Sequence, residues 1–136
     1  MIREAAEFAE RAHEGVYRKG TKIPYITHPM ETAAIVTAFT NEPEMIAAAL
    51  LHDVIEDAGA TKEELEEKFG SRVAFLVESE SEDKSRSWME RKGTTVEHLK
   101  SATRDEKILA LADKLSNIRS TVRDYLVLGD EVWQRF

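Results

Sequence analysis

The chain has 136 residues, no cysteine, and a formal net charge of −7, from 19 Lys and Arg against 26 Asp and Glu. This length suits one domain with its own core, and the absence of cysteine excludes disulfides and thiolate metal sites. No apolar run approaches the roughly 20 residues of a membrane span, the N-terminus lacks a signal-peptide pattern, and the acidic balance disfavours a nucleic-acid coat. We therefore expect a single cytoplasmic domain over residues 1–136, without membrane or nucleic-acid partners.

The spacing of apolar residues is helical in nearly every part of the chain. In the first segment, small and aromatic side chains recur every three or four residues until Gly15. Thr61 and Glu64 form a capping-box pattern that marks the start of a later helix, and Gly70 marks its end. The helices predicted in this way are a first ending at Gly15, a second from near Pro29 to Asn41, a third over about 43–58, then 62–69, VAFLVES after Ser71, and 107–128.

Two stretches lack this spacing. Residues 16–28 form a basic segment interrupted by Gly20 and Pro24, which predicts a loop. Residues 79–106 are polar, and there we expect loop and irregular helix. Because no segment alternates convincingly as a strand and no repeat is visible, the prediction is an all-α helical bundle of six or seven helices.

An acidic cluster follows the apolar part of the third predicted helix, in the sequence LLHDVIED. On a continuous helix, His52, Asp53, Glu56 and Asp57 lie in one arc of about 140°, opposite the apolar side chains. Carboxylates at i and i+4 repel each other, and the helix macrodipole disfavours negative charge at a C-terminus. A divalent metal offsets this charge directly; the alternative is a solvated acidic face with one packed histidine.

Two further segments favour the metal. Asp113 interrupts the apolar run KILALADKLSN, and buried carboxylates are normally paired or bound to a metal. Asn117 lies one turn further along the same face. His28 stands where the basic loop enters the second helix, and its alternative role is a helix cap or a core histidine. Two imidazoles and two carboxylates from three segments suit Mn²⁺, Fe²⁺ or Zn²⁺, with coordination positions left for water.

Together these motifs resemble the HD-domain phosphohydrolases, and within them the hydrolase domain of the RelA/SpoT group and the small stand-alone alarmone hydrolases. The resemblance covers about residues 11–119 and rests on RKG, PYITHP, HDVIED, FGSRVAFLV, ERK and LADKLSNIR. It implies an HD-type fold, a divalent ion that is usually manganese, and release of pyrophosphate from the 3′ position of (p)ppGpp. The roles that it implies are metal ligation by His28, His52, Asp53 and Asp113, catalysis by Glu56 and Asp57, and nucleotide binding by Arg18, Lys19 and Asn117.

The chemistry of these residue types agrees with the implied roles. A bound divalent ion lowers the pKa of a water ligand. Glu56 or Asp57 is then placed to take the proton of that water, and the nearby second carboxylate raises the proton affinity of one of them. Arg18 and Lys19 supply positive charge to a polyphosphate, and Arg18 alternatively stacks flat on a purine. For YRKGTK taken alone, the alternative is an ordinary solvated loop.

One segment departs from the alarmone hydrolases. Residues 78–89 are denser in acids and serine and contain Trp88. Two alternative functions therefore stay open, an HD-domain phosphohydrolase acting on another nucleotide or phosphate ester, and a non-catalytic nucleotide-binding regulator. His13 and His98 are assigned no role beyond a structural or solvated one. An oligomer is compatible with these observations.

Overall fold

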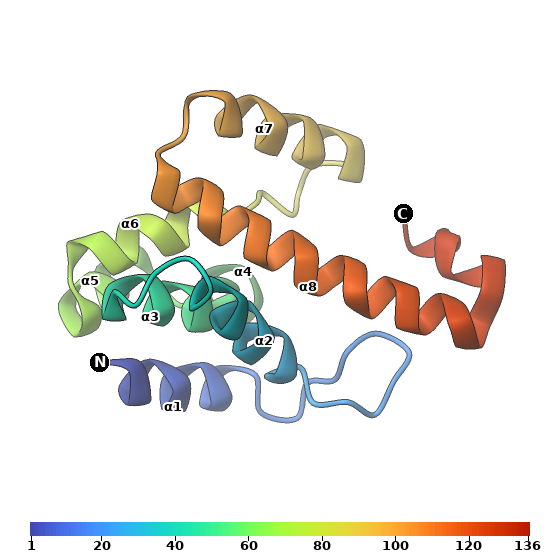
Figure 1. Ribbon diagram of the computed structural model, residues 1–136, viewed down its shortest axis with the longest axis horizontal. Coiled ribbons are helices and arrows are strands. Elements are labelled where there is room, and N and C mark those ends of the chain that lie inside the picture. Colours follow the sequence, from blue (N-terminus) through green and yellow to red (C-terminus); the bar gives the residue numbers. More distant parts are fainter.

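The computed structural model describes residues 1–136 and contains eight α-helices, a C-terminal 3₁₀ helix and no β-strand (Figure 1). The all-α prediction is confirmed, with more helices than the six or seven expected. None of these helices combines the length and the apolar character that crossing a membrane requires. The elements are α1 (Ile2–Ala12), α2 (Thr27–Val36), α3 (Pro43–Leu51), α4 (Val54–Ala58), α5 (Lys62–Phe69), α6 (Ser71–Glu80), α7 (Trp88–Ser101), α8 (Arg104–Leu128) and the 3₁₀ helix η1 (Gly129–Arg135).

Helix α3 is the central element of the core. It packs against α1, α2, α6 and α8, and its sequence after Glu44 is apolar on every side, as expected for a helix surrounded by others. Three consecutive alanines, Ala47, Ala48 and Ala49, are completely buried. Their short side chains let the neighbouring helices approach closely. The core therefore holds the C-terminal end of α3 in a fixed position.

The third predicted helix is in fact two helices, because the backbone breaks at His52 and Asp53. Helix α3 ends at Leu51, and α4 begins at Val54 after Asp53, whose carbonyl accepts a hydrogen bond from the Asp57 N–H at 2.9 Å. Glu56 therefore lies in the first turn of a separate short helix. The unfavourable macrodipole expected for the end of one long helix does not apply to this arrangement.

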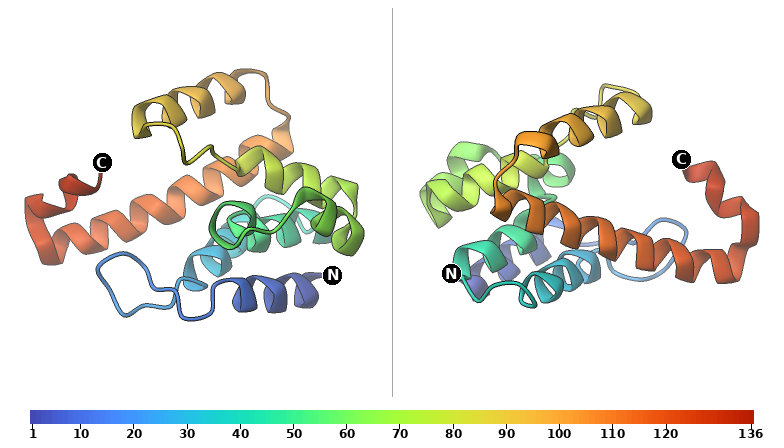
Figure 2. Two further views of the ribbon diagram at one scale, coloured as in Figure 1. Left: turned by 180° about the vertical axis from the view of Figure 1, so that it is seen from behind. Right: turned by 45° about the horizontal axis from the view of Figure 1, so that its top comes forward.

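The expectation of loop and irregular helix over residues 79–106 holds for the segment between α6 and α7 but was wrong for residues 88–101. A regular helix, α7, occupies half of this stretch, and Figure 2 shows it standing apart from the bundle, beside the start of α8. Ser87 and Glu90 form a capping box that starts it, and Thr103 and Glu106 form another that starts α8. The spacing of apolar residues did not predict α7, because none of its residues is buried and the helix therefore has no apolar face against the core. The two S/T-x-x-E patterns were the available signal.

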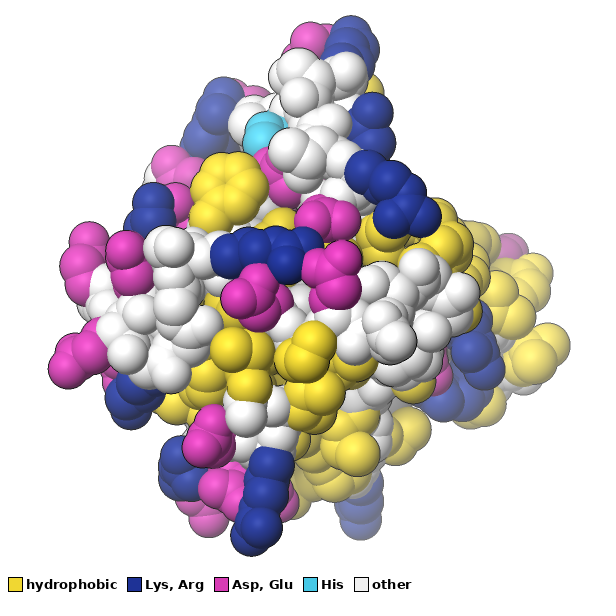
Figure 3. All heavy atoms as spheres, turned by 60° about the vertical axis from the view of Figure 1, so that its left-hand side comes forward, with side chains coloured by type: hydrophobic (Ala, Val, Ile, Leu, Met, Phe, Trp, Pro, Cys, Tyr) yellow, Lys and Arg dark blue, Asp and Glu magenta, His cyan; other side chains and the backbone are white.

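Arg72 on α6 connects the ends of three helices through ion pairs. One guanidinium nitrogen lies 2.6 Å from Glu42 and 2.8 Å from Glu44 at the start of α3, and the other lies 2.7 Å from Asp105 at the start of α8. The face drawn in Figure 3 carries acidic and basic side chains interspersed among hydrophobic ones. Because one guanidinium serves three carboxylates, Arg72 contributes to the relative placement of α3, α6 and α8.

Candidate metal and hydrolytic site

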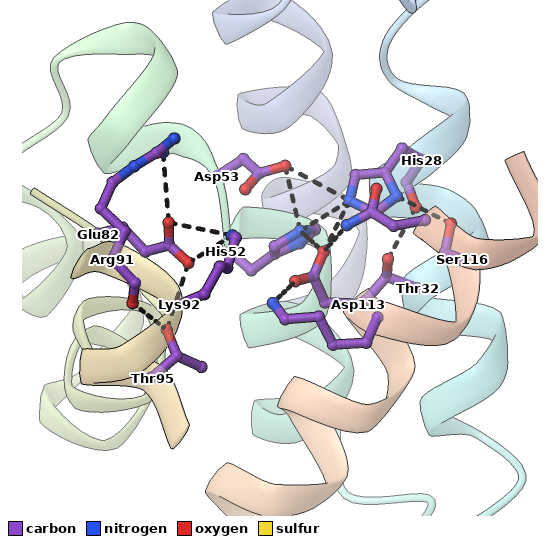
Figure 4. A network of polar contacts seen from close by, with 12 residues as sticks. His28, Thr32, His52, Asp53, Glu82, Arg91, Lys92, Thr95, Asp113 and Ser116 are labelled. Carbon is purple, nitrogen blue, oxygen red and sulfur yellow. Dashed lines mark hydrogen bonds and ion pairs between the residues drawn. The ribbon is translucent and has the colours of Figure 1, made fainter. Parts of the chain in front are cut away.

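Four polar side chains from separate segments of the chain meet beside α8 (Figure 4). His28 comes from α2, His52 and Asp53 from the break between α3 and α4, and Asp113 from α8. The Nε2 atoms of the two histidines lie 3.1 Å apart, and Asp113 Oδ1 lies 3.0 Å from His28 Nε2 and 3.2 Å from His52 Nε2. Asp53 Oδ2 is 3.1 Å from His52 Nε2 and 3.6 Å from His28 Nε2. The structure thus brings together all four side chains that were predicted as metal ligands.

The opposite nitrogen of each imidazole has a partner that orients the ring. His52 Nδ1 lies 2.7 Å from the Ala49 carbonyl oxygen, and a carbonyl only accepts, so Nδ1 carries a proton and Nε2 is the nitrogen that faces the cluster. His28 Nδ1 lies 2.8 Å from the hydroxyl oxygen of Ser116, which is buried one turn beyond Asp113 on α8. Partners of this kind typically fix metal-ligating histidines. His28, His52 and Asp113 are all buried and close enough to hold one ion, and this donor set fits a first-row divalent metal.

Burial and charge act against each other on the ionisable groups of this cluster. Burial lowers the pKa of His52, but the charges of Asp53 and Asp113 outweigh it and raise that pKa well above its usual range. Burial raises the pKa of Asp53, whereas His52 lowers it, to about 2. Burial likewise raises the pKa of Asp113, and its contacts with His28 and His52 hold it well below the usual range. Two ionised carboxylates are therefore concentrated in a buried place, which favours a cation there.

Glu56 and Asp57 lie on α4, next to this cluster, in unequal surroundings. A Glu56 carboxylate oxygen accepts a hydrogen bond from the Glu82 N–H. Burial raises the pKa of Glu56, and the nearby charges of Asp53 and Glu82 add to that increase against the lowering effect of this hydrogen bond. Burial also raises the pKa of Asp57, but contacts with His13 and Lys84 outweigh it and lower that pKa. Of the two adjacent carboxylates, Glu56 is the better proton acceptor, while Asp57 is held ionised.

The side chains predicted to bind the nucleotide are only partly gathered at this site. Arg18 Nη2 lies 3.4 Å from Asn117 Oδ1, and Asn117 Nδ2 donates to Asp113 Oδ1 at 3.1 Å. The Arg18 guanidinium also lies 5.6 Å from the ring centroid of Tyr25. Lys19 is exposed and forms no hydrogen bond or ion pair.

Two groups at the site were missed from the sequence. The Tyr25 hydroxyl donates to Asp53 Oδ2 at 2.7 Å, and the Lys114 ammonium lies 2.6 Å from Asp113 Oδ2, leaving the other Asp113 oxygen to face the imidazoles. Tyr25 stands within PYITHP and Lys114 directly follows Asp113, so the only signal in the sequence was that each lies close to a predicted metal ligand.

Glu80 lies near Lys114. Burial and the charge of Asp113 raise the pKa of Glu80 to about 7, with Lys114 opposing them.

Comparisons with known proteins place the chain among described relatives. Residues 5–132 match the HD domain family. The guanosine-3′,5′-bis(diphosphate) 3′-pyrophosphohydrolase MESH1 of Homo sapiens is 42% identical to this chain over 126 residues, and that of Xenopus tropicalis is 40% identical, with 90% of this chain and 70% of each relative covered. A protein of Haemophilus influenzae with the same functional name is 39% identical over 118 residues, which are 82% of this chain and 17% of that protein.

Solved structures give the same result. A metazoan ortholog of SpoT, described as hydrolysing ppGpp and playing a role in starvation responses, superimposes with a TM-score of 0.83 and 34% sequence identity, over 88% of this chain and 69% of that one. A protein of Listeria monocytogenes superimposes with a TM-score of 0.73 and 38% identity, over 80% of this chain and 71% of that one. Sequence and fold thus point to the same relatives.

Proposed function

Because this chain belongs to the HD domain family and is similar to the MESH1 hydrolases over 90% of its length, we propose that it is a guanosine-3′,5′-bis(diphosphate) 3′-pyrophosphohydrolase. The family membership confirms the resemblance drawn from the motifs. The reaction would release pyrophosphate from the 3′ position of (p)ppGpp. The observation that carries the proposal is the cluster of buried His28, His52 and Asp113, joined by the partly buried Asp53, next to the Glu56 carboxylate.

A divalent metal ion, with Mn²⁺ as the preferred ion, would be held by the four side chains of this cluster. Three observations support the fit: the donors are two imidazole nitrogens and two carboxylate oxygens, both imidazoles have their Nδ1 atoms engaged, and the Tyr25 hydroxyl fixes Asp53. Bound there, the ion would act as a Lewis acid and lower the pKa of a water molecule.

The residues around the cluster have separate tasks in the proposed reaction. Glu56 takes the proton of the attacking water on its carboxylate, because its raised pKa makes it the better acceptor of the acidic pair. Asp57 stays ionised and orients the same water. Arg18, Lys19 and Asn117 contact the nucleotide, with the two cations facing its phosphates. Positive charge at this place is needed because the floor of the site is acidic.

A panel of substrates tests the proposal. The protein with Mn²⁺ is given ppGpp, pppGpp, other nucleotides and phosphate monoesters, and pyrophosphate and orthophosphate are measured separately, with His28→Ala as the inactive control. We expect pyrophosphate from ppGpp at a rate that His28→Ala abolishes. Orthophosphate released from a monoester instead would favour the broader phosphohydrolase, and binding of ppGpp without any turnover would favour the regulator.

A further inference from the structure

We infer that His13 is a positioning residue for this reaction, and that its doubly protonated imidazole holds the Asp57 carboxylate in place beside Glu56 and Asp53. This inference rests on the proposed hydrolytic function. From the sequence, His13 was assigned no role beyond a structural or solvated one. In the structure it is the C-terminal cap residue of α1, and it is the point at which α1 reaches the acidic pair on α4.

The His13 ring is held in place by a hydrogen bond at Nδ1 and by packing of one ring face on Tyr25. Its Nδ1 lies 2.9 Å from the carbonyl oxygen of Ala9, one turn earlier on α1. Because a carbonyl only accepts, Nδ1 carries a proton. The ring packs on that of Tyr25, with centroids 4.9 Å apart and an angle of 32° between the planes. Only 3% of His13 is exposed, so water has little access to the remaining nitrogen.

That remaining nitrogen, Nε2, is buried without a hydrogen-bond partner, and it lies 3.6 Å from Asp57 Oδ2. A neutral ring would direct a lone pair toward a carboxylate and leave a buried polar atom unsatisfied. A proton on Nε2 turns the same approach into a charge-assisted contact, which a small side-chain movement shortens to hydrogen-bond distance. The geometry therefore favours an imidazolium that faces an ionised carboxylate.

The charged groups that face His13 support this protonation state. They are Asp57 on α4 and Asp53 at the break between α3 and α4; the Tyr25 hydroxyl is neutral and donates a hydrogen bond to Asp53. Burial lowers the pKa of His13, but Asp57 and the Ala9 carbonyl, with a smaller contribution from Asp53, raise it above its usual value. Charge and geometry thus agree.

The consequence for the site is that Asp57 is held from two sides. Lys84 lies 2.6 Å from Oδ1 and His13 lies 3.6 Å from Oδ2. The Lys84 side chain is 54% exposed, and exposed ion pairs of this kind contribute little because water and rotamer freedom compete with them. Most of the orientation of Asp57 therefore comes from the buried histidine.

Two substitutions separate positioning from packing. In His13→Asn, the amide nitrogen takes the place of Nδ1 and keeps the donor to Ala9, while the group facing Asp57 is lost. In His13→Gln, an amide N–H reaches the place of Nε2 without the charge. We expect kcat for pyrophosphate release to fall at least tenfold in His13→Asn, with KM and bound metal unchanged, and to recover partly in His13→Gln. The control is His98→Asn. His98 on α7 lies 2.9 Å from the Glu106 carboxylate on α8, and this pair lies outside the site.

The pH profile adds a result that lost packing would not produce. In the wild-type protein, kcat should fall as the pH rises through the pKa of His13, and His13→Gln should lack that decrease. Unchanged kcat in His13→Asn would overturn the inference. Equal losses in both variants, with equally lowered melting temperatures and an unchanged pH profile, would overturn it as well, since His13 would then only fill space.

Nitrogen NMR of the imidazole separates failure of this inference from failure of the proposed function. Without added metal at pH 7, we expect protons on both His13 nitrogens in the wild-type protein, and loss of the Nε2 proton at lower pH in Asp57→Asn. A neutral His13 in the wild-type spectrum would overturn the pairing, whatever the protein hydrolyses. A protonated His13 in a protein that releases no pyrophosphate from ppGpp would leave the pairing intact and reject the proposed reaction, and with it the role of His13 in that reaction.

Discussion

Glu56 and its neighbour Asp57 have the same functional group but different surroundings, and this difference decides their proposed roles. Glu56 is partly buried and accepts a hydrogen bond from the Glu82 N–H, whereas contacts with His13 and Lys84 lower the pKa of Asp57. Among the acidic residues at the site, Glu56 alone combines a raised pKa with a place on α4 next to Asp53. A general base at neutral pH needs both a pKa near that pH and a position close to the proton that it takes.

Glu56→Gln tests this assignment, because it keeps the shape of the side chain while it removes the charge and the basicity. We expect metal content and nucleotide affinity to persist and kcat to fall by roughly 10²-fold, as is typical when a general base is lost. Elemental analysis, equilibrium binding and initial rates measure the three quantities. Loss of the metal would instead make Glu56 a ligand, and normal turnover would leave the acidic pair without a catalytic role.

Glu80 predicts a pH dependence of stability. In the unfolded chain its carboxyl loses the proton near pH 4.5, but in the fold it keeps the proton until about pH 7. Between these values the folded state binds the extra proton, so stability falls as the pH rises. Glu80→Gln should remove this decrease and stabilise the protein at pH 8 by at most about 3 kcal/mol, since one pKa unit is worth about 1.4 kcal/mol. Urea unfolding at pH 4.5 and pH 8, in the presence of a chelator, measures the difference; equal slopes with pH in both proteins would contradict it.

At the scale of elements, helix bounds set by local capping could be predicted from the sequence, whereas features that depend on tertiary packing could not. The capping pattern at Thr61 gave the bounds of α5 over residues 62–69 as they are in the structure. The break at His52 was missed because both flanking segments have helical spacing. The contact between His13 and Asp57 could not be predicted for a related reason: the two lie 44 positions apart in the chain, and only the packing of α1 against α4 brings them together.

Helix α7 is held by polar contacts, which predicts how it moves. The Glu82 carboxylate gathers Arg91, Lys92 and Thr95 from this helix, at distances from 2.9 to 3.3 Å (Figure 4). A segment without buried apolar residues opens at low free-energy cost. Glu82→Ala should therefore raise hydrogen exchange of the α7 amides about tenfold, because tenfold corresponds to about 1.4 kcal/mol, and leave α3 unchanged.

The matched control for α7 is Glu97→Ala, which removes an ion pair with Lys100 on the exposed side of the same helix. Mass spectrometry of exchanged peptides reports both variants. Equal exchange of α7 in Glu82→Ala and in Glu97→Ala would mean that the Glu82 cluster does not hold the helix.

At the scale of the whole molecule, the proposed metal would connect α2, the end of α3, and α8. Asp113→Ala should lose both the bound ion and activity, and also the stability that the ion adds. At a free Mn²⁺ concentration 100 times Kd, binding to the folded state alone adds about 2.7 kcal/mol. Melting curves with Mn²⁺ and with a chelator should therefore differ for the wild-type protein and coincide for Asp113→Ala. A stoichiometric ion in the purified variant would reject Asp113 as a ligand.

The three buried alanines of α3 affect how this protein tolerates mutation. None of their side chains belongs to the site. Only the backbone carbonyl of Ala49 takes part, because it orients His52. Each is surrounded by helices, so a larger side chain would push α1, α2 or α6 away and shift the end of α3, where His52 lies. A mutational scan scored by activity alone would therefore mark Ala47, Ala48 and Ala49 as essential, like catalytic residues. Residues without any reactive group would then limit which substitutions the site tolerates, because they fix the position of His52.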